Sequence, residues 1–172
     1  MVYAIVIYPD LQNDSKIREF RKKYDPHFQL INPHITVVFP FPDIEKEKIK
    51  SHISKIIKKH NGFSLRLKGL VKSFDNWLFL TMKEGNDKIV KLHDQLYTGI
   101  LKEHLREDIE FIPHVGLGLF ETEEEYKKAE NEAKNLNLDY KCKVKSIHLI
   151  HLKDDLSEID WSKEYLISEP TE

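Results

Sequence analysis

Two histidines in similar surroundings, His34 and His114, are the residues of this chain best suited to acid–base chemistry. His34 lies in the segment Pro-His-Ile-Thr-Val at 33–37, and His114 lies eighty residues later in Pro-His-Val-Gly-Leu at 113–117. Imidazole has an unperturbed pKa of about 6.5, so histidine can give or take a proton near neutral pH. One neutral and one protonated ring on opposite sides of a phosphorus atom would supply the base and the acid that opening a cyclic phosphodiester requires. The sequence leaves open which histidine is the base.

The residues two positions after the histidines decide how a phosphate could be held. Side chains two apart on a strand share a face, so Thr36 lies beside His34 and can donate a hydroxyl hydrogen bond to a phosphate oxygen. Gly116 takes the equivalent position after His114 and has no hydroxyl. Its half of a phosphate site would rely on His114, backbone amides or water. Gly116 and Gly118 are expected to leave that side open, although glycines in a strand can also mark a bulge or close packing.

The elements that would position these residues recur in the same order. Hydrophobic periodicity predicts strands at 2–8, 31–39, 63–69, 77–82, 111–119, 141–152 and 161–167, and helices at 13–24, 43–61, 89–101 and 122–136. Asp43 is the predicted N-cap of the second helix, and Thr122 with Glu125 forms a predicted capping box. After the first strand the two halves, residues 1–84 and 85–172, repeat the same element order. We therefore expect one bilobal α+β domain over residues 1–172, with a duplicated fold and mainly antiparallel sheets.

Composition narrows the functional classes. Of the 172 residues, 40% are hydrophobic, which is enough for a core, and the formal net charge is −2. A chain without a basic excess is not expected to bind a DNA duplex or other nucleic acid without regard to sequence, but it can still bind one or two phosphates. Cys142 is the only cysteine, so a thiolate-rich metal site and an internal disulfide are excluded. No apolar run approaches the length of a membrane span, and we expect a cytoplasmic monomer.

The two motifs, their spacing and the element order resemble the two-histidine (2H) phosphoesterases, which include the RNA 2′–5′ ligase-like and cyclic phosphodiesterase proteins. The resemblance extends along nearly the whole chain and is strongest to small bacterial members of this superfamily. It implies a bilobal, LigT-like fold with outer helices, a central cleft that binds a phosphate between the histidine strands, and no metal or cofactor. The first motif matches fully, whereas Gly116 replaces the second threonine or serine.

The resemblance implies hydrolysis of 2′,3′-cyclic phosphates or 2′–5′ bonds in nucleotides or RNA ends. His34 and His114 would be catalytic, and Thr36 and Gly116 would lie at the phosphate. Phe74 corresponds to a loop that lines the family's cleft, where it could stack on a base, although a buried aromatic is an equal alternative. Two other functions stay open: a non-catalytic module that binds nucleotides or RNA ends, and RNA ligation by the reverse reaction.

Overall fold

Two four-stranded antiparallel sheets carry the fold in the computed structural model, which describes residues 1–11, 13–42 and 44–168. The first sheet has the strand order β2-β1-β7-β8, and the second has the order β5-β4-β3-β6. The strands of the first sheet are β1 (Val2–Ile7), β2 (Ile35–Pro42), β7 (Ser146–Leu152) and β8 (Ile159–Leu166). Those of the second are β3 (Phe63–Lys72), β4 (Trp77–Glu84), β5 (His114–Leu119) and β6 (Tyr140–Val144).

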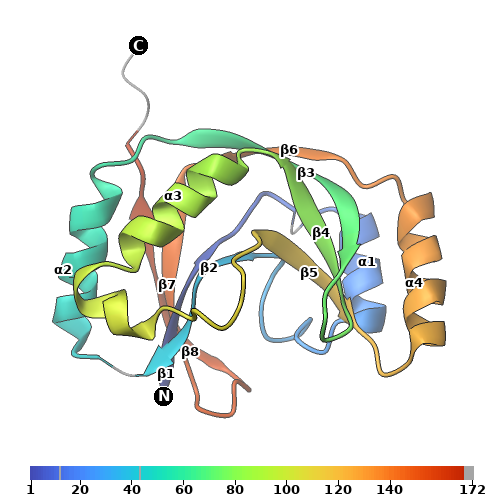
Figure 1. Cartoon of the computed structure of the whole chain (residues 1–172), viewed down its shortest axis with the longest axis horizontal. Helices are drawn as coiled ribbons and strands as arrows, with labels where there is room; N and C mark the ends of the chain where they lie inside the picture. Colours follow the sequence, from blue (N-terminus) through green and yellow to red (C-terminus); the bar gives the residue numbers. More distant parts are fainter. Residues whose placement is uncertain (12, 43, 169–172) are drawn as a thin grey trace.

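Each sheet is covered by one pair of helices. The helices α2 (Lys46–Ile57) and α3 (Asn86–Leu96) pack against strands of the first sheet, and α1 (Ser15–Tyr24) and α4 (Glu123–Asn135) pack against strands of the second. The two pairs lie on opposite sides of the molecule (Figure 1). This arrangement confirms the predicted α+β class with mainly antiparallel sheets and outer helices. No helix in the described part of the chain is long and apolar enough to cross a membrane.

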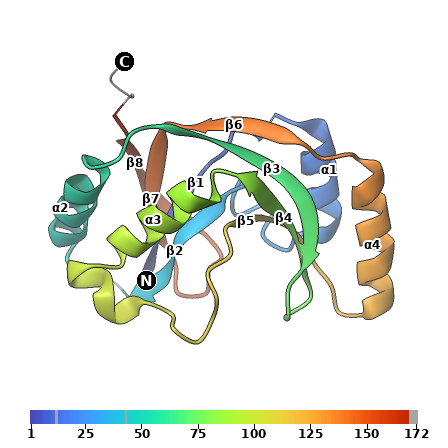
Figure 2. The same cartoon turned by 45° about the horizontal axis from the view of Figure 1, so that its top comes forward.

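The chain passes between the two sheets several times, so each sheet takes strands from both halves of the sequence. The sequence predicted one continuous strand at 141–152, and this prediction is wrong because Lys145 separates two strands, β6 and β7. The first of these, β6, pairs with β3 in the second sheet, and the other, β7, pairs with β1 in the first sheet. The Lys145 carbonyl accepts a hydrogen bond from the Ile167 amide at 2.8 Å, which fixes the crossing point. Figure 2 shows β6 and β3 running together along the top of the molecule.

The helix ends follow local sequence signals in most cases. The capping box at α4 is confirmed, because the Thr122 side chain accepts from the Glu125 amide and the Glu125 carboxylate accepts from the Thr122 amide. The helix predicted for 89–101 ends earlier, at Leu96, and a 3₁₀ helix, Gly99–His104, follows. Gly99 has a positive φ of 54°, which an α-helix cannot continue through. Asp43 lies outside the described residues, and Glu45 is the N-cap of α2.

The core uses the alternation that the sequence predicts. In β3, Leu65 and Leu67 are buried under the helices, whereas Arg66 and Lys68 point away from them toward solvent. Burying one such leucine contributes about 1.5–3 kcal/mol. β2 continues through Pro40-Phe41-Pro42, beyond the predicted end of this strand at residue 39. The two prolines are tolerated because β2 is an edge strand and needs no amide donors on its outer side.

Candidate active site

One cleft contains all five residues that the sequence predicts for the site. It lies where β2 packs against β5 and has a volume of about 840 Å³. The predicted residues that line it are His34, Thr36, Phe74, His114 and Gly116. Since β2 belongs to the first sheet and β5 to the second, the cleft joins the two sheets at their edge strands.

The two histidines are held in the same way. The Nδ1 atom of His34 lies 3.0 Å from the carbonyl oxygen of Asn32, and Nδ1 of His114 lies 2.5 Å from the carbonyl oxygen of Ile112. A carbonyl oxygen can only accept, so Nδ1 carries the proton in both rings and donates. The neutral form of each histidine therefore keeps its lone pair on Nε2. That nitrogen is the atom each ring can use for proton transfer.

A buried proline in each motif explains this shared geometry. Pro33 and Pro113 separate each histidine from the residue whose carbonyl its ring contacts. Proline fixes its own φ near −65° and keeps the preceding residue extended, so the backbone that brings the carbonyl to the ring is largely set in advance. The Pro-His pair in each motif is thus a positioning device as well as a sequence signature.

Burial shifts both histidines toward their neutral forms. Desolvation lowers the pKa of His34 from 6.5 to about 4, against the opposing effect of the Asn32 carbonyl. Smaller effects come from Arg21 and His114, which lower this pKa, and from Asp25, which raises it. Desolvation also lowers the pKa of His114, while the Ile112 carbonyl and Asp75 oppose that change. Because the charge on one imidazole affects the other, the two rings can titrate as a pair.

Thr36 offers the hydroxyl that the sequence predicts. It lies on β2 opposite Val6 of β1 and is half-buried in the cleft. Within the described part of the chain, its hydroxyl makes no hydrogen bond to another protein group. A ligand oxygen entering the cleft could therefore accept this hydrogen bond.

An indole ring packs beside Gly116. A Cβ atom added to Gly116 would lie 3.4 Å from Cζ3 of Trp77, which is an ordinary van der Waals contact. Trp77 in turn stacks on His27, with ring centroids 5.6 Å apart. Gly116 lines the cleft, and the Trp77 indole borders it on one side.

Gly118 does not share the cleft with Gly116. A Cβ atom there would lie 2.7 Å from Cβ of Tyr24 and 2.9 Å from the Phe120 ring, on the side of β5 that α1 covers. The pairing of β4 with β5 has a register shift between the partners of Leu78 and Phe79, which interrupts the alternation. The glycine at 118 therefore permits close packing of α1, one of the structural explanations that the sequence left open.

Three aromatic residues of the cleft were not predicted as site residues. Phe79 stacks on the His114 ring at a centroid distance of 3.5 Å and an interplanar angle of 20°. Phe39 also lines the cleft, although a residue five positions after His34 would lie on the opposite face of a regular strand. A register shift in β2 between the partners of Ile5 and Val6 changes the alternation after Thr36. Trp77 and Phe79 alternate on β4 toward the cleft, but nothing in their spacing distinguishes them from core residues.

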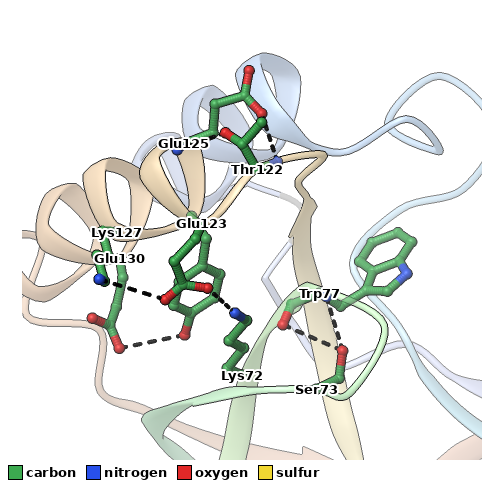
Figure 3. A network of polar contacts seen from close by, with 9 residues as sticks. Lys72, Ser73, Trp77, Thr122, Glu123, Glu125, Lys127 and Glu130 are labelled. Atoms are coloured by element: carbon green, nitrogen blue, oxygen red, sulfur yellow. Dashed lines mark hydrogen bonds and ion pairs between the residues drawn. The ribbon is translucent and has the colours of Figure 1, made fainter.

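The loop that carries Phe74 is a tight, hydrogen-bonded turn. The Ser73 hydroxyl accepts from the Trp77 amide at 2.8 Å (Figure 3). The Ser73 amide donates to the Trp77 carbonyl at 2.9 Å. Phe74 at its tip is 89% exposed, so of the two predicted alternatives the buried aromatic is wrong. The ring borders the cleft and has an open face for another flat ring.

Charged side chains of the cleft are mostly engaged elsewhere. Asp25 accepts from the buried Arg21 guanidinium at 2.7 Å, and Lys72 pairs with Glu123 on α4. Figure 3 shows Lys72 pointing to α4 while the indole of Trp77 points the other way. Residues 1–11, 13–42 and 44–168 contain no group of three or more metal-ligating side chains. The arrangement fits acid–base chemistry carried by the two imidazoles.

Comparison with known proteins agrees with this fold. The family model described as the 2′-5′ RNA ligase superfamily matches residues 8–156. The protein named "Putative phosphoesterase GK0864" from Geobacillus kaustophilus is 27% identical over 154 residues, which cover 88% of each chain. A relative from Bacillus cereus strain B4264 with the same type of name is 28% identical over 156 residues, again 88% of each chain.

Solved structures show the same architecture at low sequence identity. The crystal structure of E. coli LigT complexed with 3′-AMP matches with a TM-score of 0.63 and 15% identity, over 98% of each chain. The protein TT0787 of Thermus thermophilus matches with a TM-score of 0.58 and 15% identity, over 98% of this chain and 96% of the other. At this identity the likeness concerns the fold, and it agrees with the two-sheet topology described above.

Proposed function

The chain belongs to the 2′-5′ RNA ligase superfamily, and we propose that it is a phosphoesterase that hydrolyses 2′,3′-cyclic phosphates or 2′–5′ bonds of nucleotides or RNA ends without a metal ion. The observation that carries this proposal is the pair of histidines with matching carbonyl hydrogen bonds on one cleft. The names of the curated relatives support the wider class of phosphoesterase. The structures of LigT with 3′-AMP, NADP+ and ATP support a nucleotide as ligand.

In this proposal His34 is the general base and His114 is the general acid. A general base must be neutral when it takes a proton. Burial lowers the pKa of His34 to about 4, so this ring is neutral at any pH well above that value. His34 Nε2 takes a proton from water as the water oxygen bonds to phosphorus. His114 Nε2 gives a proton to the ribose oxygen as its bond to phosphorus breaks. The product is a nucleoside monophosphate, and one proton exchange with solvent restores both rings.

The Asp75 carboxylate supports the choice of His114 as the acid. This carboxylate raises the pKa of His114, whereas at His34 the charges of Arg21 and Asp25 act in opposite directions. An anionic phosphodiester between the rings would favour protonation of either imidazole. The ring with the more favourable surroundings for a proton is His114, so it is the better proton donor in the complex.

Thr36 and the backbone at Gly116 would hold the phosphate in this proposal. The Thr36 hydroxyl would donate to a non-bridging oxygen on the β2 side, and a donor aimed at developing charge lowers the barrier by about 3 kcal/mol. On the β5 side no hydroxyl is available at position 116, so only backbone and water donors contribute there. Phe74 would stack on the base of the nucleotide, at the exposed rim of the cleft.

The test is hydrolysis of 2′,3′-cyclic AMP in the presence of a chelator, followed by phosphorus NMR. We expect the cyclic phosphate resonance to be replaced by that of a monoester, and we expect His34→Ala and His114→Ala to remove this activity. The position of the product phosphate also reports which ribose oxygen leaves. Activity that survives in either alanine variant would contradict the proposal.

A non-catalytic nucleotide-binding module is the second candidate, and the Gly116–Trp77 contact is the observation in its favour. The indole beside Gly116 adds an aromatic binding surface at a position that offers no hydroxyl to a phosphate. Calorimetry that detects 3′-AMP binding, with no turnover of cyclic or 2′–5′ substrates, would favour this candidate. The retention of both histidines in hydrogen-bonded positions favours the enzyme.

A further inference from the structure

We propose that Arg106 binds a second phosphate of the substrate, adjacent to the one between the histidines, by exchanging its ion pair with Asp108 for that phosphate. The inference rests on the proposed function, because it takes the position of the first phosphate from it. It assigns the substrate class as nucleotides with at least two phosphate groups, such as a 5′-phosphorylated nucleotide or an oligonucleotide end.

The first observation is the set of charges that line the cleft. Besides Arg106, the charged residues on its described lining are Asp25, Lys72, Asp75, Asp108 and Glu110. Asp25 is neutralised by Arg21, and Lys72 is bound to Glu123 and lies 4.8 Å from the centre of the Tyr126 ring. Lys72 is thus paired with a residue outside the cleft, whereas Arg106 is paired with Asp108, which lines the cleft itself. A ligand with several negative charges would need it to offset the remaining carboxylates.

The second observation is the geometry of the Arg106–Asp108 pair. Nε of Arg106 donates to Oδ1 of Asp108 at 2.7 Å, and a terminal nitrogen donates to Oδ2 at 2.6 Å. The guanidinium can present the same two parallel donors to a phosphate. The side chains are 53% and 62% exposed, so water competes with this pair and a phosphate can replace Asp108 readily.

The third observation is the position of Arg106 relative to the histidines. Arg106 lies on the exposed segment between the 3₁₀ helix and β5, whereas His34 and His114 are half-buried. A residue at the rim of the cleft is suited to bind a second phosphate of the ligand, next to the phosphate whose bond is cleaved between the histidines. The cleft volume of about 840 Å³ lies toward the upper end of the range of about 300–1,000 Å³ for small-molecule sites, so a ligand with two phosphates fits.

The test is calorimetric binding of adenosine 3′,5′-bisphosphate and 3′-AMP to the wild-type protein and to single variants. We expect the wild type to bind the bisphosphate about tenfold or more tightly than 3′-AMP, and Arg106→Ala to lose this preference while binding 3′-AMP unchanged. Asp108→Asn should increase affinity for the bisphosphate, because it removes the competing carboxylate. Arg66→Ala is the matched control, since Arg66 makes the same two-point contact with Asp139 outside the cleft.

Two results would overturn the inference. If Arg106→Ala weakens 3′-AMP and the bisphosphate equally, Arg106 acts at the first phosphate or supports the loop. If it changes neither, the pair with Asp108 is a solvated surface contact. Neither result depends on turnover, so the proposed hydrolysis can fail while the binding preference remains, and the two failures are distinguishable.

Discussion

Replacing His34 by glutamine should reduce the loss of stability that the protein suffers in mild acid. In the folded chain His34 has a pKa of about 4, because burial disfavours its charged form, whereas in the unfolded chain its pKa is 6.5. As pH falls from 6.5, the unfolded state takes up a proton at this residue and the folded state does not. Stability from the neutral imidazole is therefore present above pH 6.5 and is lost as pH falls toward 4.

The size of the effect follows from the two pKa values. Each pH unit between them corresponds to about 1.36 kcal/mol, so the difference between 6.5 and about 4 amounts to about 3 kcal/mol. Between pH 6.5 and pH 4, the unfolding free energy of the wild type should therefore fall by about 3 kcal/mol more than that of His34→Gln. His114 contributes its own loss to both proteins, so the difference between them reports His34 together with its coupling to His114.

Urea unfolding at a series of pH values measures this difference, with the fluorescence of Trp77 and Trp161 as the signal. Thr36→Val is the matched control, because it alters the same face of β2 without changing a titrating group. We expect this control to run parallel to the wild type between pH 6.5 and 4. Equal pH dependence in the wild type and in His34→Gln would refute the argument that burial keeps this imidazole neutral.

The proposed mechanism leads to three other expected outcomes. The pH profile of kcat/KM for a 2′,3′-cyclic nucleotide should be bell-shaped, with its maximum between about pH 4 and pH 6.5, because the active form needs neutral His34 and protonated His114. A value of kcat/KM that rises through pH 6–7 would contradict the role of His34 as the base. Thr36→Val should lower kcat about 100-fold with little change in thermal stability, and an unchanged kcat would remove Thr36 from the phosphate site. Phe79→Leu should shift the descending limb of the profile to higher pH, because His114 loses the stacked ring that excludes water from it; if the limb stays in place, this stacking does not control the acid.

The histidine motifs could be predicted because their signals are local. Apolar strands, the position of Thr36 relative to His34, and the Thr122–Glu125 capping box all depend on residues close together in the sequence. The repeated element order supplied the expectation that the two histidines meet. The structure places both on one cleft. The assignment of repeat halves at 1–84 and 85–172 stays a prediction.

Other features depend on contacts between distant residues, and no local pattern signals them. Lys145 moves the chain from one sheet to the other within a run that reads as a continuous strand. Trp77 reaches Gly116 across the β4–β5 pair, and Phe79 stacks on His114 in the same way. Nothing in the sequence distinguishes Arg106 from the other basic residues, and only the folded chain places it on the cleft.

The central claim is that His34 and His114 act as base and acid on one phosphate. The most direct test compares a 2′,3′-cyclic nucleotide with a deoxynucleoside 3′-(p-nitrophenyl phosphate), whose leaving group departs without a proton. We predict that His114→Ala loses activity on the cyclic nucleotide but keeps most of it on the nitrophenyl ester, while His34→Ala loses both. Equal losses on the two substrates in both variants, or the reverse pattern between them, would contradict the claim.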